Sequence, residues 1–160
     1  MSPPEQEAQD AAPQDEQAAA RTQRVEAALD ELAAFLRTGA SDGWVRVDLA
    51  ARLVADAAEA DVHESLGDGS TSPAAVAEPE LFGLLRELRE AMYDPDDDGA
   101  WFSLRLYAVP GDGRWLAVNH FGEPAWRVPL PDEKYREDLE RYPREYSELP
   151  DWLSAKVEQT

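Results

Sequence analysis

An acidic run in the middle of the chain is the segment whose residue types and spacing best suit chemistry. The alternate carboxylates of Asp94, Asp96 and Asp98 match the opening of a calcium loop, in which such side chains converge on the ion. Gly99 follows and permits a sharp turn. The twelfth position of a calcium loop supplies a bidentate Glu, but Arg105 occupies it here. The sequence therefore favours an exposed turn, or a patch that faces a partner, over a calcium site.

Other catalytic and metal-binding patterns find little support. The chain has no Cys, and His63 and His120 are its only histidines. No HExxH spacing brings the two imidazoles together, and no G-x-S-x-G motif surrounds a serine. We therefore predict no metal site and no hydrolytic triad. Hydrolysis by a pair of carboxylates stays open in so acidic a chain, although the spacing singles out no pair.

Trp126 lies in a segment, EPAWRVPLP, that has three prolines and no regular hydrophobic pattern. Its ring is either a plug over the edge of a sheet or an anchor for a partner protein. The neighbouring carboxylate of Glu123 would lie on the same surface. The predicted partner-binding residues are Asp94, Asp96, Asp97, Asp98, Glu123 and Trp126.

The charge of the chain restricts its partners. Thirty-four acidic and fifteen basic residues give a formal net charge of −19. Such a field repels nucleic acid and anionic membranes and attracts a basic protein, although excess acid also serves solubility alone. Between Ala55 and Asp98 there are thirteen acids and only two bases, Arg86 and Arg89. We expect an acidic face to form in this middle part of the chain.

The N-terminus differs in composition from the rest. Residues 1–18 hold five acids, no base and three prolines, which is too little apolar surface to offset the entropy of ordering. We predict a disordered acidic and Ala-rich tail at 1–18, followed by a single domain at 19–160. The first residues lack the positive charge and apolar run of a signal peptide, and no window is apolar enough to span a bilayer. These patterns indicate a cytoplasmic protein.

Hydrophobic periodicity predicts the elements that position these residues. Helical spacing covers 16–39, 78–93 and 132–142, and alternation covers 43–53, 59–66, 100–109 and 114–121. Short connections favour antiparallel hairpins over parallel crossovers. The predicted fold class is therefore α+β, with an antiparallel sheet of about four strands in two hairpins, covered by helices in the order α-ββ-α-ββ-α.

Alternation also predicts which side chains share a side of the sheet. In the first strand, Trp44 should lie on the side of Arg46, and Val45 on the opposite side with Val47. In the last hairpin, Trp101 and Trp115 lie on adjacent strands and could face each other, and aromatics at such spacing are more often core or helix-to-sheet cover than a recognition surface.

The C-terminal third carries a combination of motifs that resembles a known family. The combination is G-x-W-F-S, then P-G-D-G-x-W, E-P-x-W, Y-x-x-D-L-x-x-Y-P-R and a final P-D-W-L. It resembles the YezG-like immunity proteins of bacterial polymorphic toxin systems. A similar module occurs in actinobacterial proteins associated with NAD-glycohydrolase toxins. The matching residues are Gly99, Trp101, Phe102, Ser103, 110–113, Trp115, Glu123, Pro124, Trp126, Tyr135, Asp138, Leu139, 142–144 and 150–153.

The resemblance implies a small cytoplasmic protein that binds a cognate toxin and blocks it without a cofactor. A basic toxin also agrees with the negative charge of the chain. The leading hypothesis is therefore a non-enzymatic immunity protein whose partner is a protein toxin. The alternative, which the second group suggests, is an accessory or small-molecule-sensing domain associated with NAD-related toxins.

Overall fold

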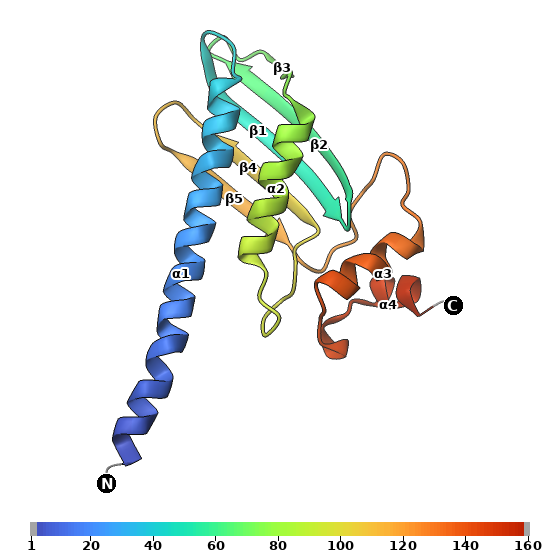
Figure 1. The fold of residues 1–160 in the computed structure, drawn as a ribbon. Helices are drawn as coiled ribbons and strands as arrows, with labels where there is room; N and C mark the ends of the chain where they lie inside the picture. The colour runs from blue at the N-terminus through green and yellow to red at the C-terminus, as the bar shows by residue number, and fades with distance from the viewer. Residues whose placement is uncertain (1–2, 159–160) are drawn as a thin grey trace.

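One antiparallel sheet of five strands forms the centre of the computed structural model. The structure describes the backbone of residues 3–158 and the side chains of residues 15–145 and 147–158. The strand order is β3-β2-β1-β4-β5 (Figure 1). The strands are β1 (Trp44–Val54), β2 (Ala57–Leu66), β3 (Thr71–Pro73), β4 (Ser103–Ala108) and β5 (Arg114–Asn119). The helices are α1 (Pro3–Thr38), α2 (Glu78–Met92), α3 (Asp132–Arg141) and α4 (Asp151–Val157), with a 3₁₀ turn at Tyr146–Glu148.

The predicted α+β fold class and the order α-ββ-α-ββ-α are confirmed. The two predicted hairpins, β1–β2 and β4–β5, join into a single sheet because β1 also pairs with β4, with Leu49 opposite Leu106. The strand count is one higher than expected, since β3 adds to the outer edge of β2. This strand has three residues and ends in Pro73, so it has too little periodicity to be distinguished from the turn around it.

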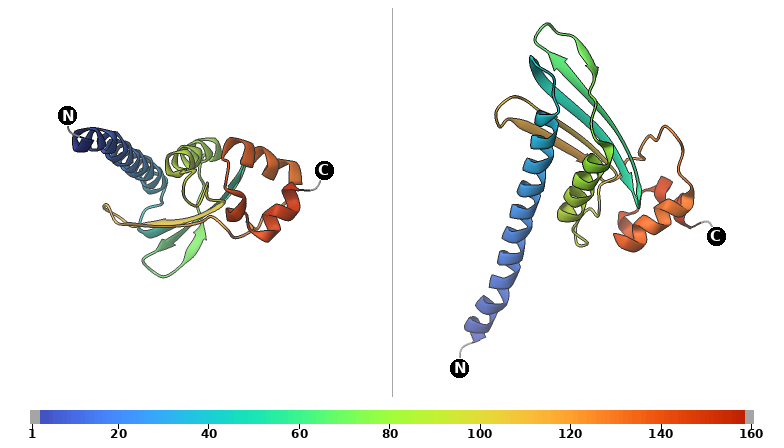
Figure 2. Two further views of the ribbon diagram at one scale, coloured as in Figure 1. Left: turned by 90° about the horizontal axis from the view of Figure 1, so that it is seen from below. Right: turned by 45° about the horizontal axis from the view of Figure 1, so that its top comes forward.

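Helices α1 and α2 lie side by side over one face of the sheet (Figures 1 and 2). Leucines at helical spacing on both helices pack against leucines and valines that alternate along β1 and β4. The largest fully buried side chains are Trp101, Phe102, Leu32, Leu36, Leu49, Leu53, Leu81, Leu85, Leu88, Leu104, Leu106 and Leu153. The side chains at the alternate positions along each strand lie on the other face of the sheet.

The start of β1 departs from the predicted alternation. Trp44 pairs with Leu66 and Arg46 with Ser65, so β1 has one extra residue at this point. Such a bulge moves a side chain to the opposite face of the sheet. Trp44 therefore packs against the core instead of lying with Arg46, and Val45 is 46% exposed.

The first helix begins earlier than the sequence indicates. Residues 3–18, which composition predicts to be disordered, continue α1 as one helix from Pro3. The side chains from Asp15 to Arg24 are all exposed, so this stretch of α1 adds nothing to the core. The predicted domain boundary at residue 19 stays a prediction.

The C-terminal helices lie at one end of the sheet, beside the β1–β2 turn (Figure 1). They enclose a second, smaller core of Val54, Phe102, Tyr135 and Leu153. Helix α4 was not among the predicted elements because its seven residues span too few turns to display a helical period.

A buried ion pair connects these helices to the rest of the fold. Arg89 of α2 donates to both carboxylate oxygens of Asp138 of α3, at 2.5 and 2.9 Å, and both side chains are at most 3% exposed. Arg89 also donates to the carbonyl of Trp101 at 2.7 Å. The Asp138 carboxylate accepts the backbone N–H of Ala55, at the β1–β2 turn, at 2.7 Å. One ion pair thus joins α2, α3, the hairpin turn and the segment that enters β4.

Replacing Asp138 should destabilise the protein strongly. Asp138→Asn leaves the Arg89 guanidinium buried without its counter-charge, which costs about 3–5 kcal/mol in comparable buried pairs. Urea unfolding monitored by tryptophan fluorescence measures the loss. The matched control is Asp56→Asn, because Asp56 forms a 2.9 Å pair with Lys134 in an exposed position. The control should keep the wild-type midpoint, and an equal effect of the two substitutions would contradict this assignment.

Candidate functional site

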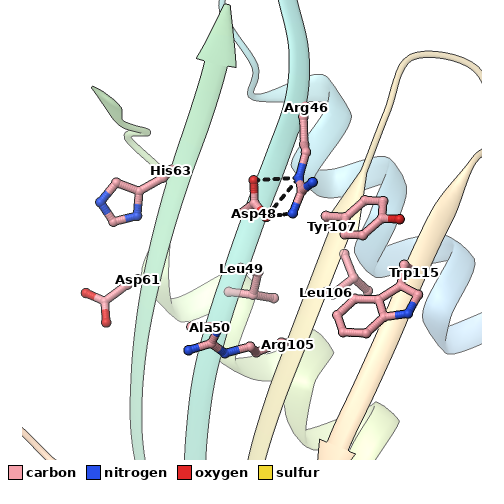
Figure 3. A pocket seen from close by; sticks show the side chains of 10 residues that line it. All are labelled: Arg46, Asp48, Leu49, Ala50, Asp61, His63, Arg105, Leu106, Tyr107 and Trp115. Carbon is pink, nitrogen blue, oxygen red and sulfur yellow. Dashed lines mark hydrogen bonds and ion pairs between the residues drawn. The ribbon is translucent and has the colours of Figure 1, made fainter. Parts of the chain in front are cut away.

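The face of the sheet opposite α1 and α2 carries the most distinctive group of exposed side chains. In the described part of the chain no helix lies over this face (Figure 2). A shallow depression of about 520 Å³ lies on it, lined by the ten residues drawn in Figure 3. Strand register builds the lining, since His63 of β2 and Tyr107 of β4 both lie opposite Asp48 of β1, and Tyr107 lies opposite Trp115 of β5.

Three side chains on this face hold one another in place. Arg46 donates to Asp48, with the closest pair of atoms 2.6 Å apart, and its guanidinium lies 4.1 Å from the centroid of the Tyr107 ring. The hydrogen bonds to Asp48 raise the pKa of Arg46. Tyr107 stacks on Trp115 with centroids 5.5 Å apart and planes 18° from parallel. Trp115 remains 48% exposed, so a large aromatic surface is held rigid and presented to solvent.

A network of arginines and carboxylates closes the end of the face nearest α3. Arg52 of β1 pairs with Glu59 at 3.1 Å and with Asp61 at 3.3 Å. Arg127, from the loop before α3, pairs with Asp61 and donates its backbone N–H to Glu59 at 2.9 Å. Burial opposes ionisation of both acids, but the hydrogen bonds from the two arginines outweigh it and lower the pKa of each. Both carboxylates are therefore charged and engaged at neutral pH.

Arg105 lies in the middle of the same face in a different situation. Its cross-strand neighbours are Ala50 of β1 and Ala117 of β5, so small side chains flank it on both strands. Among the described side chains, none forms an ion pair with Arg105, which is exposed. The acids closest in register, Asp48 and Asp61, pair with other arginines.

The acidic turn that the sequence singled out follows α2, at its lower end in Figure 1. The Asp94 carboxylate pairs with Arg21 of α1 at 2.7 Å and accepts the backbone N–H of Asp96 at 2.9 Å. Asp96 and Asp97 are exposed, and Asp98 is half-buried. No group of three or more acidic or histidine side chains in the described part of the chain is arranged to hold a metal ion. The turn connects α2 to β4.

The loop that holds Glu123 and Trp126 is separate from that turn. The indole N–H of Trp126 donates to the hydroxyl of Tyr135 at 3.1 Å, and the ring packs against the second core. Glu123 is exposed and pairs with Lys156 of α4 at 3.3 Å. Trp126 thus covers the aromatic cluster at the end of the sheet, and it lies on a different surface from Asp94.

The acidic residues of the middle segment do not share one face. Glu59 and Asp61 lie on the face of the sheet opposite α1 and α2, which we call the open face. Glu64 of the same strand points to the other side and accepts the backbone N–H of Ser41. The acids of α2 lie on the outer side of that helix, Asp56 and Asp68 lie in the turns before and after β2, and the remaining acids lie in the turn that follows α2. Arg46, Arg105, Tyr107 and Trp115 were not among the predicted site residues. Alternation assigns each one to a side of its own strand, but their convergence depends on the pairing of β1 with β4 and of β4 with β5.

Trp101 and Trp115 do not face each other across the hairpin. Trp101 precedes β4 and is fully buried in the main core, while Trp115 lies opposite Tyr107 on the open face. The two histidines are also apart, since His63 belongs to β2 and His120 follows β5, with β1 and β4 between those strands.

Comparison with models of known protein families gives no match, and comparison with proteins of curated function gives none either. The resemblance to immunity proteins therefore stays a prediction. No helix in residues 3–158 combines the length and the apolar character needed to cross a bilayer.

His120 should make the stability of the fold depend on pH. Burial, the largest influence, and the nearby Arg144 cation lower the pKa of His120 below its ordinary value of 6.5, although Asp98 opposes the shift. Just below pH 6.5 the unfolded chain binds more protons at this site than the folded one, so this contribution to stability falls as the pH drops. The contribution of His120 to stability is complete above pH 6.5.

His120→Gln removes this contribution, because glutamine does not titrate. Urea unfolding at pH 7.5 and 5.5 tests the expectation. For each protein the free energy of unfolding at pH 5.5 is compared with its own value at pH 7.5, so that packing lost by the substitution cancels. The variant should lose less stability than the wild type between the two pH values. An equal loss in both proteins would show that His120 titrates alike in the folded and unfolded states.

Proposed function

We propose that this chain is a non-enzymatic immunity protein that binds and neutralises a basic protein toxin in the cytoplasm, and that it docks through the open face of the sheet. The observation that carries the proposal is the group of Arg46, Arg105, Tyr107 and Trp115 on that face, in which Arg46, Arg105 and Trp115 are exposed. Trp, Tyr and Arg are the residue types that contribute most binding energy at protein interfaces. The motif combination in the C-terminal third supports the choice of an immunity protein among binding proteins.

The distribution of charge supports a division of roles between the two sides of the molecule. The open face carries four arginines and three carboxylates, so it adds one positive charge to a chain of net charge −19. These residues are Arg46, Arg52, Arg105, Arg127, Asp48, Glu59 and Asp61. The whole excess of negative charge therefore lies elsewhere, including the exposed sides of α1 and α2. Such a field steers a basic partner toward the protein from a distance, whereas the open face provides the close contacts.

A second candidate function is an accessory or small-molecule-sensing domain associated with NAD-related toxins. The depression of about 520 Å³ favours it, because a stacked aromatic pair beside an unpaired arginine suits a flat anionic ligand. A thermal-shift screen against nucleotides separates the two functions. A ligand at one hundred times its dissociation constant adds about 2.7 kcal/mol of stability. A nucleotide that raises the melting temperature would favour the sensing domain.

Co-expression tests the proposed function. Each protein encoded by the two genes that flank this one is expressed from an inducible promoter, with and without this chain. We expect one of them to stop growth alone and to be neutralised by this chain, and the purified pair to associate. Trp115→Ala should reduce protection, whereas Gln23→Ala, which shortens an exposed side chain of α1 on the opposite side of the sheet, should not. Unchanged killing in the presence of this chain would contradict the proposal.

A further inference from the structure

The open face contains a contact that restricts the chemistry of the partner more narrowly than net charge does. Arg105 is the residue concerned, in β4 between the pairing strands β1 and β5. The side chains directly across from it are those of Ala50 and Ala117, which are too short to cover its guanidinium. The Arg105 side chain extends from β4 toward Ala50 of β1, on the same face as the stacked rings of Tyr107 and Trp115 (Figure 3).

The charge of Arg105 is unbalanced within its own face. Asp48 accepts three hydrogen bonds from Arg46, and Asp61 pairs with both Arg52 and Arg127. Each nearby acid thus already has an arginine partner. Acids outnumber bases by more than two to one in this chain, yet Arg105 forms no ion pair among the described residues. Its five N–H donors are available to a ligand from outside.

We propose that Arg105 is the specificity-determining contact of the open face, and that it binds the carboxylate of an Asp or Glu side chain on the partner toxin. This inference rests on the proposed function. A guanidinium forms two parallel hydrogen bonds with a carboxylate, and the exposed ring of Trp115 covers the apolar part of the same partner segment. Ala50 and Ala117 leave room for the approach.

The long-range field and the local contact select different features of one partner. The net charge of −19 produces a field that repels an acidic protein and attracts a basic one. The carboxylate that Arg105 binds must therefore belong to a surface that is basic as a whole. The partner surface that both features select is therefore basic and carries an isolated Asp or Glu. The pairing excludes basic proteins that lack such an acid, because Arg105 would then be desolvated without a counter-charge.

Substitution at Arg105 tests the inference against a matched control. Arg105→Glu should weaken binding of the purified toxin by about 100-fold at 150 mM salt, because two carboxylates would then face each other. Arg105→Lys should weaken it by about tenfold, since an ammonium does not reproduce the two-pronged bond. The control is Arg24→Glu, an exposed position on α1 with the same change of charge, which should stay within about twofold of wild type. Thermal melting verifies that all variants are folded.

A charge-reversal selection identifies the carboxylate. Cells that carry Arg105→Glu are challenged with a library of toxin variants that remain lethal alone, and protected survivors are sequenced. We expect survivors in which one Asp or Glu has become Lys or Arg. Those toxins should bind Arg105→Glu more tightly than they bind the wild-type chain.

Failure of the inference and failure of the proposed function give different results. If neither flanking-gene protein binds the wild-type chain, the proposed function is overturned and the inference with it. If a toxin binds and Arg105→Glu matches the Arg24→Glu control, the function stands and the inference is overturned. A survivor set without any charge reversal overturns it as well, as does a nucleotide that binds the wild-type chain and loses affinity in Arg105→Glu.

Discussion

The buried ion pair between Arg89 and Asp138 determines where the C-terminal third of the molecule can lie. The Arg89 guanidinium lies 5.8 and 5.0 Å from the centroids of the Phe102 and Tyr142 rings and donates to the carbonyl of Trp101, before β4. The Asp138 carboxylate accepts the N–H of Ala55, which has a positive φ of 52° at the β1–β2 turn. Removing either charge would leave the other buried and uncompensated. The pair thus holds α3 at the end of the sheet.

That position has a functional consequence for the rest of the sheet. A sheet needs cover on its apolar face, and α1 and α2 supply it with their leucines. Since α3 and α4 are attached at the end, they leave the second face open. The second face tolerates solvent because its outward residues are charged, aromatic or small, and because Arg46 and Arg52 satisfy its acids. The same residues that make the face stable in water also make it suited to a protein partner.

Local patterns in the sequence predicted the elements well and their assembly only in part. Leucine spacing in α1 and α2 and alternation in β1, β4 and β5 were readable because each repeats over several turns or residues. The bulge after Trp44 was not readable from the sequence, because one inserted residue does not change the composition of the strand. The adjacency of β1 and β4 is a long-range pairing without a local signature. It brings Arg105 next to Ala50, so the open face with its unpaired arginine was beyond prediction. The acidic turn and Trp126 drew attention by composition, but Asp94 and Trp126 have structural partners in Arg21 and Tyr135.

Docking through the open face is tested most directly by amide hydrogen exchange of the purified chain, alone and in complex with the toxin that it neutralises. Backbone amides of β1, β4 and β5, together with the loop around Arg127, should exchange more slowly in the complex. The exposed side of α1 and the turn at Asp96 should be unchanged. Protection confined to α1, α2 or that acidic turn, with unchanged exchange across the sheet, would contradict docking through the open face.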